Sequence, residues 1–377
     1  MRIRALTVLR IFGIPIRIDY SWLIIFFLIM YSMAEGYFPT VHRQFSTQEY
    51  WLMGFIAAFL LFVSVLLHEL AHSFVARKQG IEVTSIRLFL FGGVSQISTE
   101  PSSGRHEFLI ALAGPALSMA LALFFGAIFF FTLLQGKLQA AGLLAMTLSY
   151  ANFILALFNM IPGFPLDGGR ILRAILWDRW NDLARATRVV SQIGNAVALF
   201  LMILGVVQFA FRGSLISALW LIFIGLFMKQ SSMGSYQSVV IKQALAGTEV
   251  RQVMTENIAS VGWLTPVNEL VQEHIYKYHF TDFPVLNGDE LLGMVSLAQV
   301  KAIPKELWVF KQVRDIMTPI EEVTSLKPND SVTDALSKMI AAERDRMPVI
   351  ENDRLVGIVS RRDIMQLFKI KTELGVA

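Results

Sequence analysis

Long apolar stretches dominate the first 228 residues and constrain the fold more than any other feature. Hydrophobic residues make up 55% of the 377 residues and charged residues only 16%, which is too apolar for an ordinary soluble protein. A helix needs about 20 predominantly apolar residues to cross a bilayer. Segments near this length cover residues 21–34, 51–76, 107–134, 140–160, 189–211 and 215–228. This part of the chain is therefore predicted to be a polytopic α-helical membrane domain of about six spans.

The distribution of basic residues predicts how these stretches cross the membrane. Lysines and arginines gather at the N-terminus, in residues 77–87 and 170–188, and after residue 229, whereas the alternate loops hold few charges. Because loops rich in Lys and Arg stay in the cytoplasm, we expect a multi-pass protein of the cell membrane with its N-terminus and soluble part on the cytoplasmic side. The net charge of +4 then reflects topology, and we expect no nucleic-acid partner.

Two segments of the apolar half have the composition of strands. Residues 6–20 alternate loosely and contain a glycine and a proline, which predicts a short hairpin at the membrane surface. Residues 83–97 are rich in β-branched and aromatic residues around Gly92 and Gly93. They predict strands with a bulge or a close backbone approach at the glycines. These strands form either a plain connecting hairpin or a surface that pairs with an extended peptide.

One motif near the end of the second apolar stretch combines three residues used in metal chemistry. It reads His68-Glu69-Leu70-Ala71-His72, and two histidines four residues apart lie on one face of a helix. This spacing lets both imidazoles bind one Zn²⁺, with Glu69 as a candidate general base. Residues 51–62 hold no charged residue, and ionisable groups at membrane depth are costly and usually functional. The alternative is a pair of core histidines with hydrogen-bond partners inside the protein.

A hydrolytic zinc site uses three protein ligands and leaves one position for water. The chain has no cysteine, so the third ligand must be a histidine or a carboxylate. We favour Asp167, because prolines and glycines in residues 161–170 break the helix and expose its carboxylate within an apolar region. Bound zinc would lower the pKa of its water to about 7, and Glu69 could pass that proton to a leaving amine. The other candidates for the third ligand are Glu82, Glu107 and Asp178.

Two polar residues flank the broken segment. Asn159 lies about one turn before it, where it could bond a substrate carbonyl or a developing oxyanion. The alternative is that Asn159 bonds its own helix. Arg170 ends the segment and is expected to face lipid headgroups rather than the reaction.

Together these motifs resemble a known family. The pattern His68-Glu-Leu-Ala-His72, followed by Asn159-Met-Ile-Pro-Gly-Phe-Pro-Leu-Asp167-Gly-Gly-Arg, is similar to that of the site-2 proteases, which are intramembrane zinc metalloproteases. The resemblance covers residues 1–230 and implies that family substrates are membrane-spanning proteins cut within or near their span. It also implies the role of each motif residue. One zinc per chain is bound by His68, His72 and Asp167, Glu69 is the catalytic base, Asn159 contacts substrate, and Gly92 and Gly93 lie in a strand that binds an unwound substrate helix.

After residue 247 the sequence repeats itself at a period of 63–64 residues. Val253-Met254-Thr255 corresponds to Ile316-Met317-Thr318, and Phe283-Pro284-Val285 corresponds to Met347-Pro348-Val349. The pattern predicts that each repeat contains a helix, two strands joined by a turn, and a second helix. A Ser- and Gln-rich stretch at 229–243 precedes the repeats and is predicted to be a linker.

The repeats resemble CBS domains, so the soluble part is expected to be an α/β tandem CBS (Bateman) module. We place the linker at 231–247 and the two domains at 248–306 and 311–372. The resemblance implies an adenine-nucleotide site in which Ser360 and Asp363 of Ser360-Arg361-Arg362-Asp363 contact the ribose. The first copy has Ser296-Leu297-Ala298-Gln299 and lacks the Asp, so one site is expected. The alternative is a module that only forms a homodimer.

We therefore expect an intramembrane zinc endopeptidase that cuts membrane-spanning proteins near the cytoplasmic leaflet. A CBS-regulated channel or transporter, with His and Asp lining a permeation path, is the alternative. The endopeptidase is favoured because transport does not require His-Glu-x-x-His together with a distant aspartate on a broken segment. An inactive scaffold is disfavoured because Glu69 and all three candidate ligands are present.

Overall fold

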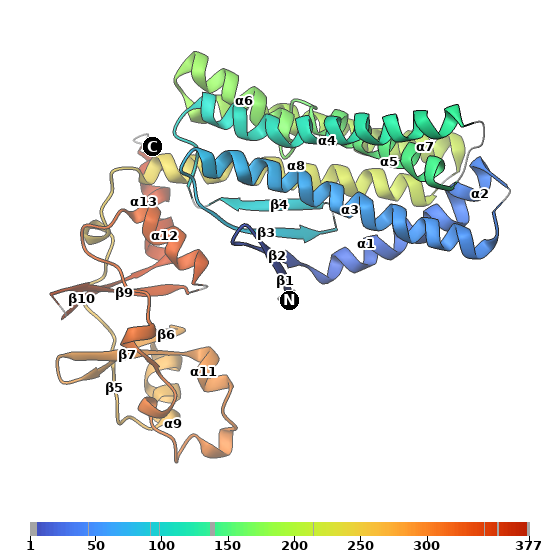
Figure 1. Ribbon diagram of the computed structural model, residues 1–377. Coiled ribbons are helices and arrows are strands. Elements are labelled where there is room, and N and C mark those ends of the chain that lie inside the picture. Colours follow the sequence, from blue (N-terminus) through green and yellow to red (C-terminus); the bar gives the residue numbers. More distant parts are fainter. Residues whose placement is uncertain are drawn as a thin grey trace. The chain divides into compact units, whose positions relative to one another are not determined.

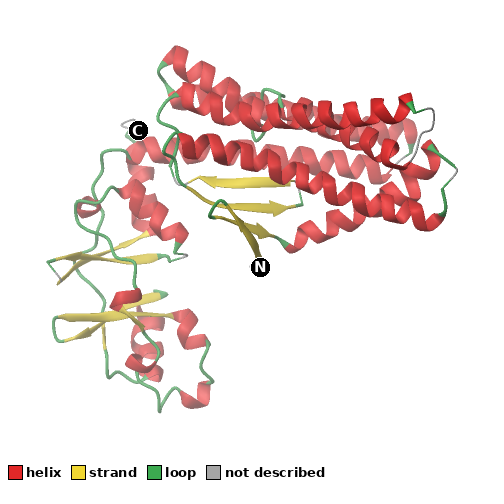
Figure 2. Cartoon of the chain, in the orientation of Figure 1, coloured by secondary structure: helices red, strands yellow, loops and turns green. Residues whose placement is uncertain are grey.

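The computed structural model forms two compact units, Met1–Gln237 and Ser238–Ala377. The first is mainly helical, and the second mixes helices with strands (Figures 1 and 2). The structure describes residues 6–43, 45–90, 92–97, 99–135, 140–213, 215–342, 344–352 and 354–374.

Within the described residues, six helices are long and apolar enough to cross a membrane, as the sequence predicts. The first span, Tyr20–Val41, comprises α1 (Tyr20–Tyr31), a π-helical stretch (Ser32–Tyr37) and α2 (Phe38–Val41). Much of the loop expected between the first two stretches is therefore helical, because a proline near the start of a helix loses no intrahelical hydrogen bond. The remaining spans are formed by α3 (Thr47–Lys78), α4 (Gly104–Leu134), α5 (Ala140–Asn159), α7 (Leu183–Arg212) and α8 (Leu215–Leu245).

The ends of the long helices follow from capping residues in the sequence. Ser46 and Glu49 form a reciprocal capping box at the start of α3, with the Glu49 carboxylate accepting from the Ser46 backbone N–H at 2.7 Å. Such a box satisfies backbone donors that a helix start leaves unpaired. The same helix ends at the basic pair Arg77-Lys78, whose charge suits the negative end of the helix dipole.

The predicted strands form a four-stranded sheet in the order β1-β2-β3-β4. The hairpin of β1 (Leu6–Ile11) and β2 (Ile14–Ile18) turns through Phe12 and Gly13, which both have positive φ. Strand β2 pairs in parallel with β3 (Val83–Phe89), and β3 pairs antiparallel with β4 (Gly92–Ile97). An apolar cluster that includes Ile16, Ile86 and Ile110 packs this sheet against α3 and α4. Strand β4 consequently lies alongside α3 (Figure 1).

The segment between α5 and α7 breaks as predicted. The backbone leaves helical geometry after Asn159 and resumes it in α6 (Asp167–Trp180). Helix α6 ends at Asn181, which adopts the left-handed conformation. Asp182 then caps the start of α7 through a 2.9 Å bond to the Arg185 N–H.

The Ser- and Gln-rich stretch expected as a linker is helical, not irregular, since α8 continues to Leu245. Its serines are accommodated by bonds to the preceding turn, such as Ser235 Oγ to the Ser231 carbonyl at 3.0 Å. Leu245 itself is fully buried in an apolar cluster of the second unit. This burial explains why the helix persists beyond the apolar segment.

The second unit contains the two predicted repeats. The first has β6 (Asp282–Asn287), β7 (Glu290–Ser296) and α11 (Leu297–Lys301), and the second has β9 (Arg346–Glu351), β10 (Arg354–Ser360) and α13 (Arg361–Glu373). A helical segment precedes each strand pair, at residues 267–278 and in α12 (Val332–Ala341). The leading strand β8 (Thr318–Pro319) of the second repeat pairs with β7 of the first, and Thr255 of the first forms a bridge to Ile358 of β10. Each repeat thus completes the sheet of the other.

Candidate metal centre and its surroundings

Helix α3 brings His68 and His72 together on one face, with their Nε2 atoms 3.2 Å apart. Both residues are buried, at 4% and 3% exposure. Asp167, the first residue of α6, places Oδ2 3.1 Å from each of these nitrogens. Three ligand atoms from two distant segments therefore meet in a nearly equilateral triangle. Among the described residues, these three are the group of metal-binding side chains that converges in this way.

The size of this triangle matches a tetrahedral zinc site. With metal–ligand bonds of about 2.0–2.2 Å, neighbouring ligands of tetrahedral Zn²⁺ lie about 3.3 Å apart. The observed separations of 3.1–3.2 Å agree with this value. Two imidazoles and one carboxylate are also a protein donor set of hydrolytic zinc sites. The residues present therefore fit the metal.

The outward-facing nitrogens of both histidines have hydrogen-bond partners. His72 Nδ1 donates to the Ile110 carbonyl at 2.6 Å. A carbonyl cannot donate a proton, so Nδ1 carries the hydrogen, and the neutral ring has its lone pair on Nε2. His68 Nδ1 lies 2.9 Å from Ser118 Oγ, another residue of α4. Partners of this kind fix the orientation and tautomer of metal-binding histidines.

Gly114 leaves the space in which the two histidines meet. A Cβ atom on this residue would overlap Nε2 of both His68 and His72. The glycine lies one turn before Ser118 on α4, so the same helix face provides both the free volume and a histidine partner. Neither residue could be identified from the sequence, because their contacts with the histidines join segments far apart in the chain.

Several contacts hold the α6 segment that carries Asp167. Glu107 of α4, with a side chain of 0% exposure, accepts hydrogen bonds from the guanidinium of Arg173. This pairing explains why Glu107, a candidate third ligand, lies outside the triangle. Ser232 Oγ of α8 donates to the Phe164 carbonyl at 2.5 Å. The glycines after Asp167 lie in regular helix and do not loosen the chain, since a Cβ on Gly168 would overlap the Met160 carbonyl group.

Glu69 follows His68 on α3, and its carboxylate is held by strand β4. Its Oε2 accepts a 2.8 Å hydrogen bond from Ser95 Oγ. Gly93 lies two residues earlier on the same face of the strand, where a Cβ would overlap Glu69 Cγ and lie 3.2 Å from Oε1. The structure therefore brings Gly93 together with Glu69, whereas Gly92 has open space around its Cβ position and a φ of +126°.

The remaining residues predicted near this site have different positions. Asn159 is the half-buried last residue of α5, and the described contacts do not join it to the two histidines, Glu69 or Asp167. Arg170 was expected to face lipid headgroups, and this was wrong, since its Nη1 lies 3.7 Å from Asp167 Oδ1. The reason is helical spacing, because residues three apart share a face.

In the second unit, Ser360 and Asp363 form a capping box at the start of α13. Asp363 Oδ2 accepts from the backbone N–H and the hydroxyl of Ser360, at 2.9 and 2.6 Å. Both residues line a cavity of about 670 Å³, together with residues that include Tyr278, Arg361 and Arg362. Arg361 Nε is buried there and has no hydrogen-bond partner among the described residues. Local sequence reasoning had missed the capping role of this motif.

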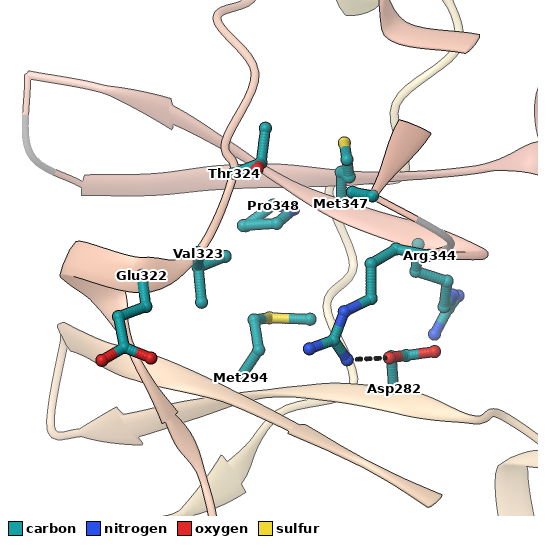
Figure 3. Close-up of a pocket in the computed structure, with 10 residues that line it drawn as sticks. Asp282, Met294, Glu322, Val323, Thr324, Arg344, Met347 and Pro348 are labelled. Atoms are coloured by element: carbon teal, nitrogen blue, oxygen red, sulfur yellow. Dashed lines mark hydrogen bonds and ion pairs between the residues drawn. The ribbon is translucent and has the colours of Figure 1, made fainter. Parts of the chain in front are cut away.

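The corresponding motif of the first repeat is engaged differently. Gln299 takes the capping position of Asp363 and donates from its amide to Thr318 Oγ1 at 2.7 Å. A smaller cavity of about 170 Å³ lies between the repeats. In Figure 3 the ion pair of Arg344 with Asp282, 3.1 Å long, closes one side of it, and Met294 projects toward its centre. The two repeats therefore differ in the room they leave for a ligand.

Comparison with known proteins gives matches for both units. The model of peptidase family M50 matches residues 56–142 and 134–204, and the CBS domain model matches residues 313–369. The chain is 35% identical to Rip3 of Mycobacterium tuberculosis, over 96% of this chain and 92% of Rip3. It is 30% identical to the zinc metalloprotease MJ0392 of Methanocaldococcus jannaschii, over 97% of each. Among solved structures, the site-2 protease from Methanocaldococcus jannaschii is 29% identical and covers 62% of this chain and 95% of its own, with a TM-score of 0.44.

Proposed function

This chain belongs to peptidase family M50, the site-2 protease family of zinc metalloproteases, and we propose that it is an intramembrane endopeptidase that cuts membrane-spanning proteins. The observation that carries the proposal is the meeting of His68 Nε2, His72 Nε2 and Asp167 Oδ2 at the ligand spacing of tetrahedral zinc. A channel or transporter needs no such triangle beside a glutamate.

In the proposed reaction, Glu69 is the general base. Zinc, when bound, polarises the scissile carbonyl and acidifies a water molecule. Glu69 takes a proton from the attacking water while the water oxygen bonds to the carbonyl carbon, and then gives that proton to the nitrogen that leaves. The net change is hydrolysis of one peptide bond.

The substrate must be unwound where it is cut, because a regular helix shields its own backbone. We propose that an extended substrate segment pairs with the outer edge of β4, which ends the sheet order β1-β2-β3-β4. Gly92 and Gly93 would let the substrate backbone come close. Asn159 would bond a substrate carbonyl.

Metal content and cleavage test this proposal together. The full chain, purified in detergent, is expected to hold one zinc per chain and to cut a synthetic single-span peptide with a fluorophore and a quencher at its ends. Glu69→Gln should keep the zinc and lose cleavage, and His68→Ala should lose both. Unchanged cleavage by Glu69→Gln would remove Glu69 from the mechanism. Comparison of the membrane proteomes of cells that produce wild-type and Glu69→Gln protein would identify natural substrates.

We also propose that the active site, the N-terminus and the CBS pair lie on the cytoplasmic side. The support is the concentration of basic residues in two segments. Residues 77–87 begin in the last turn of α3, and residues 170–188 run from the first turn of α6 into α7. A reporter fused after residue 374 should be active only in its cytoplasmic form. Activity of a periplasmic or extracellular reporter at that position would contradict this orientation.

A second proposed activity is binding of an adenine nucleotide at the larger cavity of the second unit. The cavity combines the Asp363 carboxylate, which suits ribose hydroxyls, with the guanidinium groups of Arg361 and Arg362, which suit phosphate. Arg361 Nη2 also lies 3.7 Å from Asp345 Oδ1. Calorimetry on the full chain with AMP and with ATP tests this. Asp363→Ala should weaken binding at least tenfold, whereas Asp289→Ala, an exposed acid in the β6–β7 turn, should not. Absence of binding to the wild type would leave the pair as a structural module.

A further inference from the structure

We infer that Ser95 is a positioning residue for the reaction, because its hydroxyl fixes the carboxylate of Glu69. The inference rests on the proposed role of Glu69 as general base. It concerns strand β4, which carries both Ser95 and Gly93, and helix α3, which carries Glu69.

The hydroxyl of Ser95 has one proton and two acceptors within reach. Glu69 Oε2 lies at 2.8 Å, and the Glu69 backbone carbonyl lies at 3.3 Å. The carbonyl already accepts from Ser73 Oγ at 2.9 Å, one turn later on α3. The shorter distance and the negative charge both direct the Ser95 proton to the carboxylate. Ser73 Oγ lies 3.2 Å from Ser95 Oγ, and its single proton can go either to the Glu69 carbonyl or to Ser95 Oγ. Either choice leaves the Ser95 proton for the carboxylate.

The two carboxylate oxygens of Glu69 consequently have different surroundings. Oε2 is occupied by Ser95, whereas Oε1 lies over Gly93, where no side chain intervenes. Within the described residues no hydrogen bond joins Oε1, so this oxygen is available for proton transfer. A glutamate side chain has several rotatable bonds, and a displacement of about 1 Å in a reacting group can reduce the rate about 100-fold. The bond from Ser95 removes much of that rotational freedom.

This arrangement links substrate binding to the base. The same strand that would pair with substrate through its outer edge also holds Glu69 through Ser95. A substrate segment that orders β4 would therefore also order the Glu69 carboxylate. The contribution of Ser95 should appear in kcat rather than in KM, because the hydroxyl touches the base and not the metal ligands.

The test compares the wild type with Ser95→Ala, Ser95→Thr and Ser85→Ala in the full chain, using the quenched single-span peptide that the wild type cuts. Ser85 is a matched control on the neighbouring strand β3, since its buried hydroxyl bonds Gln96 at 2.7 Å and does not touch Glu69. Zinc content, kcat and KM are measured for each protein.

Ser95→Ala should keep one zinc per chain and a KM within about twofold of the wild type, with kcat at least tenfold lower. Ser95→Thr restores a hydroxyl and should recover most of kcat, and Ser85→Ala should retain it. The inference is overturned if Ser95→Ala has wild-type kcat, loses zinc or changes mainly KM, or if Ser95→Thr is as slow as Ser95→Ala. Failure of the wild type to cut any single-span peptide would instead refute the proposed function.

Discussion

Glu107 on α4 and Arg173 on α6 form an ion pair whose carboxylate is fully buried and whose guanidinium side chain is only 12% exposed. The pair joins the helix that supports both histidines, through Ile110 and Ser118, to the helix that begins with Asp167. It therefore holds the start of α6, with Asp167, near the helix that supports the histidines. The Arg173 guanidinium also lies over the ring of Phe164, 5.2 Å from its centroid, within the loop before Asp167.

Removal of this carboxylate should destabilise the protein. Loss of one partner leaves an uncompensated buried charge, which costs about 3–5 kcal/mol. We expect Glu107→Ala to lower the unfolding temperature of the detergent-purified chain and to reduce its zinc content. Glu82→Ala removes an exposed carboxylate and should stay within about 0.5 kcal/mol of the wild type. Equal unfolding temperatures for both variants would show that the ion pair contributes nothing to stability.

Ser118 should matter for metal affinity rather than for folding. Its hydroxyl partners His68 Nδ1, and loss of such partners typically lowers metal affinity about 10- to 100-fold. We expect Ser118→Ala to release zinc to a chelator at correspondingly lower concentrations. Ser149→Ala is the control, because its hydroxyl bonds the Ala122 carbonyl, also on α4, at 2.7 Å without touching a histidine. A zinc affinity for Ser118→Ala equal to that of the control would contradict this role.

Gly93→Ala should impair the base while sparing the metal. The added methyl group would overlap Glu69 Cγ and force the carboxylate away from Ser95. We expect kcat to fall about 100-fold and zinc content to remain at one per chain. Gly36→Ala provides the control, since its added Cβ would meet only Ser32 Oγ, at 3.9 Å. If Gly93→Ala raised KM and left kcat unchanged, the glycine would serve substrate approach instead.

His274 should make the stability of the second unit depend on pH. Burial lowers the pKa of His274, and the charge of Lys277 adds to this, while Glu269 and Glu273 offset part of the shift. At pH values between this lowered pKa and the ordinary value of about 6.5, the unfolded chain binds more protons than the folded chain. The stability that neutral His274 contributes is therefore fully present above this range and is lost as the pH falls through it. The ring packs against Phe283, with centroids 5.8 Å apart, which accounts for the desolvation.

The measurement for His274 is the unfolding temperature of the full chain at about pH 7.5 and pH 5.5. We expect His274→Leu to lose less stability on acidification than the wild type. His279→Asn, at an exposed position with positive φ that Asn tolerates, should behave like the wild type. An acid response of His274→Leu identical to that of the wild type would exclude His274 as its source.

Much of the architecture could be predicted from local patterns. The apolar lengths predict the spans, the four-residue spacing predicts that His68 and His72 share a face, and the residues around Asp167 predict a broken segment. The internal repeat likewise predicts the paired strands of the second unit. These features depend on residues close together in the chain, where period and turn chemistry act directly.

The supporting contacts could not be predicted, because they join residues far apart in the sequence. Ser95 meets Glu69 and Ser118 meets His68 only once β4 and α4 pack against α3. Nothing local distinguishes these serines from others in the chain. The helical continuation of α8 was missed for a related reason, since burial of Leu245 stabilises a stretch that composition alone marks as a loop.

The exchange of leading strands in the second unit has a consequence for how this part of the protein unfolds. Strand β8 belongs to the second repeat but pairs with β7 of the first, and Thr255 of the first repeat forms a bridge to Ile358 of the second. A single repeat would therefore expose an unpaired sheet edge and would need a second repeat to pair with that edge. The two copies are therefore expected to unfold together, because separating them leaves an unpaired sheet edge on each.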